Sequence, residues 1–110
     1  MPSVNKVILL GHIGQDPRTT TTQNDHQVTE FSMATTTKFK DNKITEWHNI
    51  VCWNQNAKYI AQYGKKGGIV YVCGRKQTRS YDNKDGLKVY KTDIVADEVS
   101  LIKNKEEVPF

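Results

Sequence analysis

Alternation of apolar and polar residues along short β-rich segments constrains this chain more than any other feature. Between residues 47 and 53, Trp47, Asn49 and Trp53 fall on one side of an extended strand, while Ile50 and Cys52 fall on the other. Similar segments, rich in β-branched and aromatic residues, recur along the chain and are separated by turn-forming residues. The sequence therefore predicts five strands, at residues 4–10, 28–37, 47–53, 69–81 and 87–99. The first strand is expected to stop at Gly11, with a long loop at residues 14–27 and a charged turn at residues 38–43.

One stretch, residues 54–63, has a helical pattern instead, with Ala57, Ile60 and Ala61 on a common face and Gly64 as its stop. An Asp-Gly pair within residues 82–86 marks a hairpin between the last two strands. Three strands, one short helix and two further strands are the layout of an OB-fold. We therefore predict an all-β, five-stranded Greek-key barrel with one short helix between strands three and four.

Composition narrows the class of partner. The 110 residues suffice for one domain with a modest core. Residues 1–105 hold all 16 basic and 10 of the 12 acidic residues, a net charge of +6 that favours a polyanionic partner. No apolar run is long enough to span a membrane, and the start lacks a signal-peptide layout. We therefore expect a cytoplasmic protein, in which Cys52 and Cys73, which form no CxxC motif, are reduced thiols.

Aromatic and basic residues are interleaved on the predicted third and fourth strands and on the preceding hairpin. Rings can stack on unpaired bases while cations follow the phosphates, which is how single-stranded nucleic acid is bound without sequence preference. The predicted stacking residues are Phe39, Trp47, Trp53 and Tyr81, and the predicted cations are Lys38, Lys40, Lys43, Arg75 and Arg79.

Signals for other chemistry are weak. Residues 11–14 (GHIG) follow a strand, but the third glycine and the helix of a dinucleotide-binding turn are missing. The three histidines and two cysteines lack the spacing of metal ligands, and Asp16 and Glu46 are isolated acids of the kind usually found in turns and at surfaces. We expect no cofactor, no metal and no catalytic residues.

Several motifs together resemble the bacterial and phage single-stranded DNA-binding protein (SSB) family. They are residues 4–17 (VNKVILLGHIGQDP), 31–35 (FSMAT), 45–48 (TEWH), 63–67 (YGKKG) and 70–75 (VYVCGR) with 78–79 (TR), in the family's order. The family's stacking positions fall on the four aromatic residues named above. Asn49 stands where many members carry a basic residue, which implies weaker phosphate binding on that strand.

The resemblance implies a homotetramer that coats single-stranded DNA during replication, recombination and repair, without catalysis. It assigns dimer formation to the first strand and further assembly to outer sheet faces. A long apolar edge strand would also be a pairing hazard if it stayed exposed. The implied interface residues are Val4, Lys6, Ile8, Leu10, His48 and Tyr71.

The last residues form a separate feature, so we divide the chain into an OB domain at 1–102 and a short tip at 103–110. The tip is acidic and apolar, and it follows the domain without the long linker usual in the family. Phe110 can fill a pocket while carboxylates meet basic residues, a plausible way to recruit replication, recombination and repair proteins. The predicted recruiting residues are Glu106, Glu107, Val108, Pro109 and Phe110.

Three alternatives remain open at this point. The protein could be an OB-fold adaptor or RNA-binding protein of the replication machinery. It could also be a small nuclease, which would cleave oligonucleotides with a metal ion, or a thiol enzyme that depends on Cys52 or Cys73.

Overall fold

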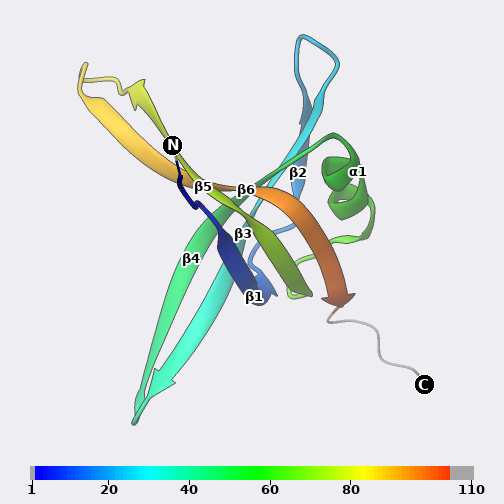
Figure 1. Ribbon diagram of the computed structural model, residues 1–110, viewed down its shortest axis with the longest axis vertical. Helices are drawn as coiled ribbons and strands as arrows, with labels where there is room; N and C mark the ends of the chain where they lie inside the picture. The colour runs from blue at the N-terminus through cyan, green and yellow to red at the C-terminus, as the bar shows by residue number, and fades with distance from the viewer. Residues whose placement is uncertain (1, 105–110) are drawn as a thin grey trace.

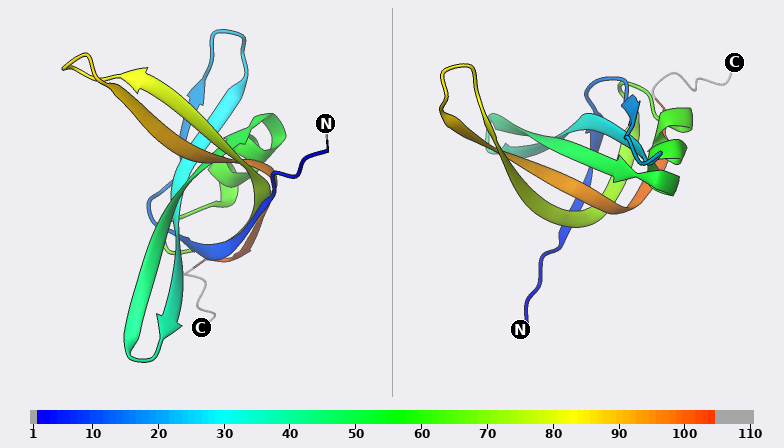
Figure 2. Two further views of the ribbon diagram at one scale, coloured as in Figure 1. Left: turned by 60° about the vertical axis from the view of Figure 1, so that its left-hand side comes forward. Right: turned by 90° about the horizontal axis from the view of Figure 1, so that it is seen from above.

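The computed structural model describes residues 2–104 and consists of a strongly bent sheet with one helix (Figures 1 and 2). The helix α1 spans Asn54–Tyr63, as the sequence predicts. The strands are β1 (Val7–Ile13), β2 (Arg18–Thr21), β3 (Gln27–Phe39), β4 (Asn42–Trp53), β5 (Ile69–Asp82) and β6 (Lys88–Lys103).

Five of the strands close into a barrel. β3 pairs with β4, and β5 with β6, in long antiparallel ladders, and β4 joins β6 through a short parallel contact at Ile50 and Val51. β1 pairs with β5 along most of its length and then with β3 at His12 and Ile13, which closes the ring. The predicted all-β OB-fold barrel is therefore confirmed, with the helix placed between β4 and β5.

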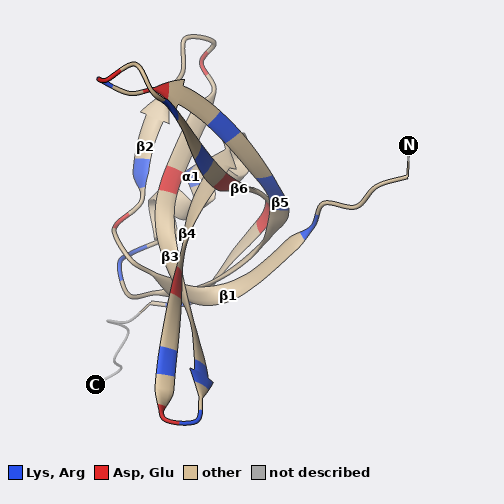
Figure 3. Cartoon of the chain, turned by 90° about the vertical axis from the view of Figure 1, so that its left-hand side faces the viewer, with Lys and Arg blue, Asp and Glu red and all other residues tan. Residues whose placement is uncertain are grey.

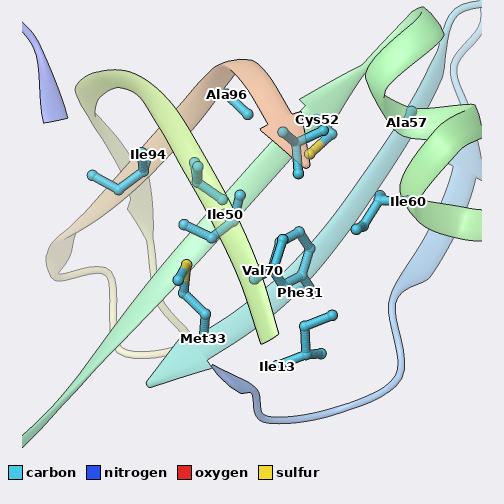
Figure 4. Packing of buried hydrophobic residues seen from close by; sticks show 12 residues of the cluster. Ile13, Phe31, Met33, Ile50, Cys52, Ala57, Ile60, Val70, Ile94 and Ala96 are labelled. Carbon is cyan, nitrogen blue, oxygen red and sulfur yellow. The ribbon is translucent and has the colours of Figure 1, made fainter. Parts of the chain in front are cut away.

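The core lies inside this ring and under the helix (Figure 4). Alternate residues of each strand reach it, as the period of two predicts. Where β1 crosses β3, Gly11 allows the two backbones to approach closely. A β-carbon at Gly11 would lie 2.2 Å from the carbonyl oxygen of Ala34, which is too close for any other residue. The buried cluster consists of Ile13, Phe31, Met33, Ile50, Cys52, Ala57, Ile60, Val70, Val72, Ile94, Ala96 and Val99.

Several strand boundaries differ from the prediction. The first strand begins at Val7 and continues to Ile13, because Gly11 serves the crossing rather than a turn. The loop predicted at residues 14–27 contains β2, whose threonines pair with β3. The predicted charged turn at residues 38–43 is mostly strand, and β6 continues to Lys103, beyond the proposed domain boundary at residue 102.

Three hairpins project from the barrel (Figure 1). The β5–β6 turn matches the predicted Asp-Gly hairpin: Gly86 has a φ of 76°, and the Asn83 side-chain oxygen accepts hydrogen bonds from the backbone N–H groups of Asp85 and Leu87. Within residues 2–104, no helix is long and apolar enough to cross a membrane.

Cys52 is fully buried in the core, and this burial raises the pKa of its thiol to about 12. A thiol of this kind stays protonated at neutral pH and is a poor nucleophile. Because the folded-state pKa lies above the ordinary value near 9.0, its contribution to stability is complete below about pH 9. It is lost progressively as the pH rises from there toward 12, where the unfolded thiol ionises first.

We therefore predict that the C73S variant, which retains only Cys52, does not react with a thiol reagent at pH 8 until urea unfolds it. Above pH 9, the free energy of unfolding should fall more steeply for this variant than for a C52A/C73S control, by up to about 1.4 kcal/mol per pH unit. Rapid labelling of the folded C73S variant at pH 8 would contradict the buried, neutral thiol.

Candidate nucleic-acid interface

β4 places two tryptophans on the outside of the barrel. Ile50 and Cys52 point into the core, so Trp47, Asn49 and Trp53 point outward. Trp47 is 63% exposed and Trp53 is 42% exposed. Two large exposed rings on one strand face are a recurrent mark of a binding surface. We call this outer side of β3–β6, which carries Trp47, Trp53 and Arg79, the groove face.

The Trp47 ring packs against the backbone of Gly14. A β-carbon at Gly14 would lie 2.4 Å from the Trp47 ring and 2.9 Å from the Ser32 hydroxyl oxygen. Gly14 is held next to β3 by the hydrogen bond from its N–H to the carbonyl oxygen of Ser32, at 2.8 Å. One side of the indole is therefore supported by the chain, and the ring remains largely open to solvent.

Two hollows lie along the groove face. The first, of about 250 Å³, is polar and includes Arg18 and Lys91. The second, of about 260 Å³, has mainly apolar walls. Glu30 borders both hollows. The first is lined by Gln15, Asp16, Arg18, Glu30, Phe31, Ser32, Asn49, Ile50 and Lys91. The second is lined by Val28, Glu30, Val51, Trp53, Gln77, Arg79, Asp93 and Val95.

Lysines gather near the tip of the β3–β4 hairpin (Figure 3). Lys38 and Lys43 are directly opposite each other across the two strands and share the side of Trp47, which faces Ala34. Two like charges in this position destabilise a hairpin unless an anion relieves them. Among residues 2–104, the ion pairs include none of Lys38, Lys40 and Lys43.

Phe39 is exposed at the same tip, where the Lys40 ammonium lies 5.6 Å from the centre of its ring. The alternation of β3 places Phe39 on the opposite side of the hairpin from Lys38. Tyr81 is exposed on β5 beside the other long hairpin, opposite Val89. The alternation of β5 places Tyr81 on the same side of the strand as Arg79, toward the end of the groove face. Of the four predicted aromatic residues, Phe39 alone therefore lies on the other side of its hairpin.

Both predicted arginines are engaged by acids. Arg75 Nη1 lies 2.7 Å from Asp97 Oδ1. Arg79 Nε lies 2.8 Å from Asp93 Oδ2, and its Nη2 lies 4.0 Å from Glu30 Oε1. The sequence prediction treated both as free cations. It could not identify these pairs, because their partners come from other strands.

Arg18 and Lys91 are the cations that the sequence analysis missed. Lys91 is directly opposite Arg79 on the neighbouring strand, and Arg18 is opposite Glu30. Alternation along residues 87–99 places Lys91 on the side of Asp93 and Val95, a signal that could have found it. No comparable signal existed for Arg18, because the short strand β2 was predicted as loop.

The predicted interface residues on β1 also come together with β5. Ile8 and Leu10 are exposed and lie opposite Cys73 and Tyr71. Partial burial raises the pKa of the Tyr71 phenol, and Cys73 adds to this effect. From Val7 to Gly11, the edge of β1 that faces away from β5 has no strand partner among the described residues.

The remaining predicted interface residues are more scattered. Val4 and Lys6 are exposed in the segment before β1. The His48 Nε2 atom lies 2.8 Å from the Thr35 hydroxyl oxygen. Thr35 also lies close to Gly11 of β1, because its methyl group would be 3.2 Å from a β-carbon there.

Features that an enzyme would need are weak in the described part of the chain. The Asp16 carboxylate accepts a 2.8 Å hydrogen bond from the backbone N–H of Lys66, which ties two loops together. Glu46 lies opposite Thr35 on the side of β4 away from the tryptophans. No group of three or more His, Cys, Asp or Glu side chains is placed to hold a metal ion within residues 2–104. The predicted tip, residues 106–110, lies outside the described residues.

Comparison with known proteins identifies the family. The model of the single-strand binding protein family matches residues 4–102. Single-stranded DNA-binding protein 1 of Chlorobaculum tepidum is 44% identical over an alignment of 109 positions that covers 94% of this chain and 67% of that protein. The single-stranded DNA-binding protein of Neisseria meningitidis serogroup A is 42% identical over 96% of this chain and 63% of its own length. The chain thus spans about two thirds of the length of these relatives.

A solved structure agrees in fold. It is described as a Plasmodium falciparum SSB complex with ssDNA, and it matches with a TM-score of 0.83 and 31% identity over 94% of this chain and 96% of that one. The family match covers nearly the whole barrel, and the bacterial relatives match it closely in sequence. The chain belongs to the single-strand binding protein family.

Proposed function

We propose that this chain binds single-stranded DNA with little dependence on sequence, by stacking bases on Trp47 and Trp53 and by attracting phosphates to lysines. The observation that carries the proposal is the pair of exposed indoles on one face of β4, beside two hollows. Every base has a π-face, so stacking tolerates any sequence. The ssDNA bound in the Plasmodium falciparum structure supports the same use of this barrel.

The cations on this surface fit a path for the backbone. Lys38 and Lys43 form an unrelieved like-charge pair at one end, while Arg18 and Lys91 border the polar hollow near the centre. Phosphates passing over these positions would release condensed counterions, so affinity should fall as salt rises. In this proposal Phe39 and Tyr81 extend the path onto the two long hairpins.

A catalytic function has no comparable support. The chain belongs to a family of DNA-binding proteins that are not enzymes. The buried, neutral Cys52 thiol is also unsuited to nucleophilic chemistry. An OB-fold adaptor that prefers RNA remains the second candidate, since base stacking does not by itself distinguish RNA from DNA.

We predict that W47A and W53A each weaken binding to a single-stranded oligonucleotide by about 1–3 kcal/mol, the range for one base stack. W47F and W53F should lose less, because a smaller ring remains. Fluorescence anisotropy of a labelled oligonucleotide measures the affinity. Y63A removes an exposed ring at the end of α1 that lines neither hollow, and should bind like the wild type.

Two results would contradict this assignment. Equal affinity for duplex and single-stranded DNA would exclude stacking on unpaired bases. If W47A bound normally but unfolded at a much lower temperature, Trp47 would be a packing residue. Tighter binding of RNA than of DNA would instead favour the adaptor.

We further propose assembly into a homotetramer, with dimers formed through the unpaired edge and the exposed apolar side chains of β1. An unpaired strand edge beside Ile8 and Leu10 readily pairs with a second copy of the same strand. The outer surface near Tyr71 would contribute to further assembly. The evidence for this step is the exposed apolar surface, in keeping with the expectation from the family resemblance.

We predict that L10E lowers the mass measured by light scattering while the barrel still unfolds in one cooperative transition, because Leu10 is 62% exposed in the single chain and lies outside the core. L87E is the matched control: Leu87 is 64% exposed near the β5–β6 turn, far from β1 in the fold. A wild-type monomer at micromolar concentration, or an L10E variant with unchanged mass, would refute assembly through β1.

The tip at residues 106–110 is proposed to recruit replication, recombination and repair proteins. Its support is chemical: two glutamates precede an apolar residue, a stiffening proline and a phenylalanine that could fill a pocket on a basic partner.

We predict that deletion of residues 106–110, and F110A alone, abolish capture of such proteins in a pull-down while oligonucleotide affinity is retained. Unchanged capture by the deletion variant would show that the tip is not the recruiter.

A further inference from the structure

Arg79 faces two acids, one of which is nearly buried. Its Nε atom lies 2.8 Å from Asp93 Oδ2, and Glu30 Oε1 lies 4.0 Å from its Nη2 atom. The Asp93 side chain is only 10% exposed, whereas that of Arg79 is 49% exposed. A carboxylate removed from water to this degree needs a cation to compensate its charge.

This pairing changes what Arg79 can offer to DNA. Arg79, Asp93 and Glu30 together carry a net charge of −1 before any ligand arrives. A phosphate could approach only the part of the guanidinium that Asp93 leaves free, where Glu30 lies 4.0 Å from Nη2. Drawing Arg79 away toward that phosphate would leave Asp93 nearly buried without its partner, which is strongly unfavourable. Arg75 differs, because its side chain and that of Asp97 are 51% and 57% exposed, and an exposed pair exchanges at little cost.

The surroundings of Arg79 suit a base better than a phosphate. The guanidinium lines the same hollow as Trp53, with walls formed by Val28, Val51 and Val95. The volume of about 260 Å³ is below that of sites for drug-sized molecules and suits one flat heterocycle. Guanidinium planes stack on unpaired bases, as aromatic rings do.

We infer that Arg79, held in place by Asp93, is a planar contact for a base in the Trp53 hollow and does not neutralise a phosphate. Asp93 is then a positioning residue, which holds the guanidinium through the ion pair at Nε and leaves its flat face available. The inference rests on the proposed binding of single-stranded DNA, and it assigns different roles to two arginines on the same strand.

Salt dependence separates the two roles. For single strands, the slope of log affinity against log salt changes by about 0.7 for each phosphate contact. R79A should therefore weaken binding to oligo(dT) at least about fivefold, the low end for one base stack, with an unchanged slope. K43A is the control for a phosphate contact, and it should reduce the slope by about 0.7.

Two further variants test the planar shape and the positioning. R79K keeps the charge but loses the plane, so it should bind as weakly as R79A. The double variant R79Q/D93N preserves the net charge, and it too should bind weakly without a change of slope. D93N alone releases the charge of Arg79 and should make the slope steeper, by up to about 0.7. Thermal unfolding of each variant checks that the barrel is intact.

The outcomes distinguish this inference from the proposed function. Absence of saturable binding by the wild type would remove the proposed function itself. If the wild type binds and R79A reduces the slope as K43A does, Arg79 is a phosphate contact and the inference is wrong. Normal binding by R79K would overturn it as well, because charge alone would then suffice.

Discussion

The barrel depends on the point where β1 leaves β5 and crosses onto β3. This crossing, at His12 and Ile13, turns an open sheet into a closed ring. It is possible because Gly11 has no side chain, so the backbones of β1 and β3 can lie closer together than any β-carbon would allow. Closure buries one face of each of the five barrel strands where they form the ring, so each outward side chain there is set by the alternation along its strand. The exposed positions of Trp47 and Trp53 follow from the burial of Ile50 and Cys52 between them.

At the centre of the groove face, acids balance the basic residues that would otherwise attract a polyanion. Lysines without an ion-pair partner among the described residues lie on the β3–β4 hairpin, whereas Glu30, Asp93 and Asp97 surround the two arginines of β5. A uniformly basic groove would bind any polyanion through charge alone, duplex DNA included. Acids at the centre lower that general attraction and leave the rings to select unpaired bases.

The sequence contains the alternation, the helix and the Asp-Gly turn, and these local signals were sufficient to predict the barrel. Interactions between strands that are distant in the sequence were not predictable in the same way. Gly11 was interpreted as a stop because a glycine within a strand and a glycine at its end look alike without the partner strand. The pairing of Arg79 with Asp93 depends on the β5–β6 register, which places Asp93 diagonally across from Arg79, beside Lys91. The strands that carry the predicted binding residues could thus be predicted from the sequence, but the acids that surround two of those residues could not.

β5 shows how one strand can serve two surfaces. Its first half, up to Gly74, pairs with β1 and carries Tyr71 and Cys73 beside the proposed subunit interface. Its second half extends past the barrel, pairs only with β6 among the described strands and carries Arg75 and Arg79. The register between β5 and β6 shifts at Cys73 and Gly74, where Asp97 is the extra residue on β6. A bulge increases local twist and bends the strands, so it can direct the two halves of β5 toward different sides of the molecule. Assembly through β1 would then leave the groove face open, because the interface and the hollows use different halves of the strand that connects them.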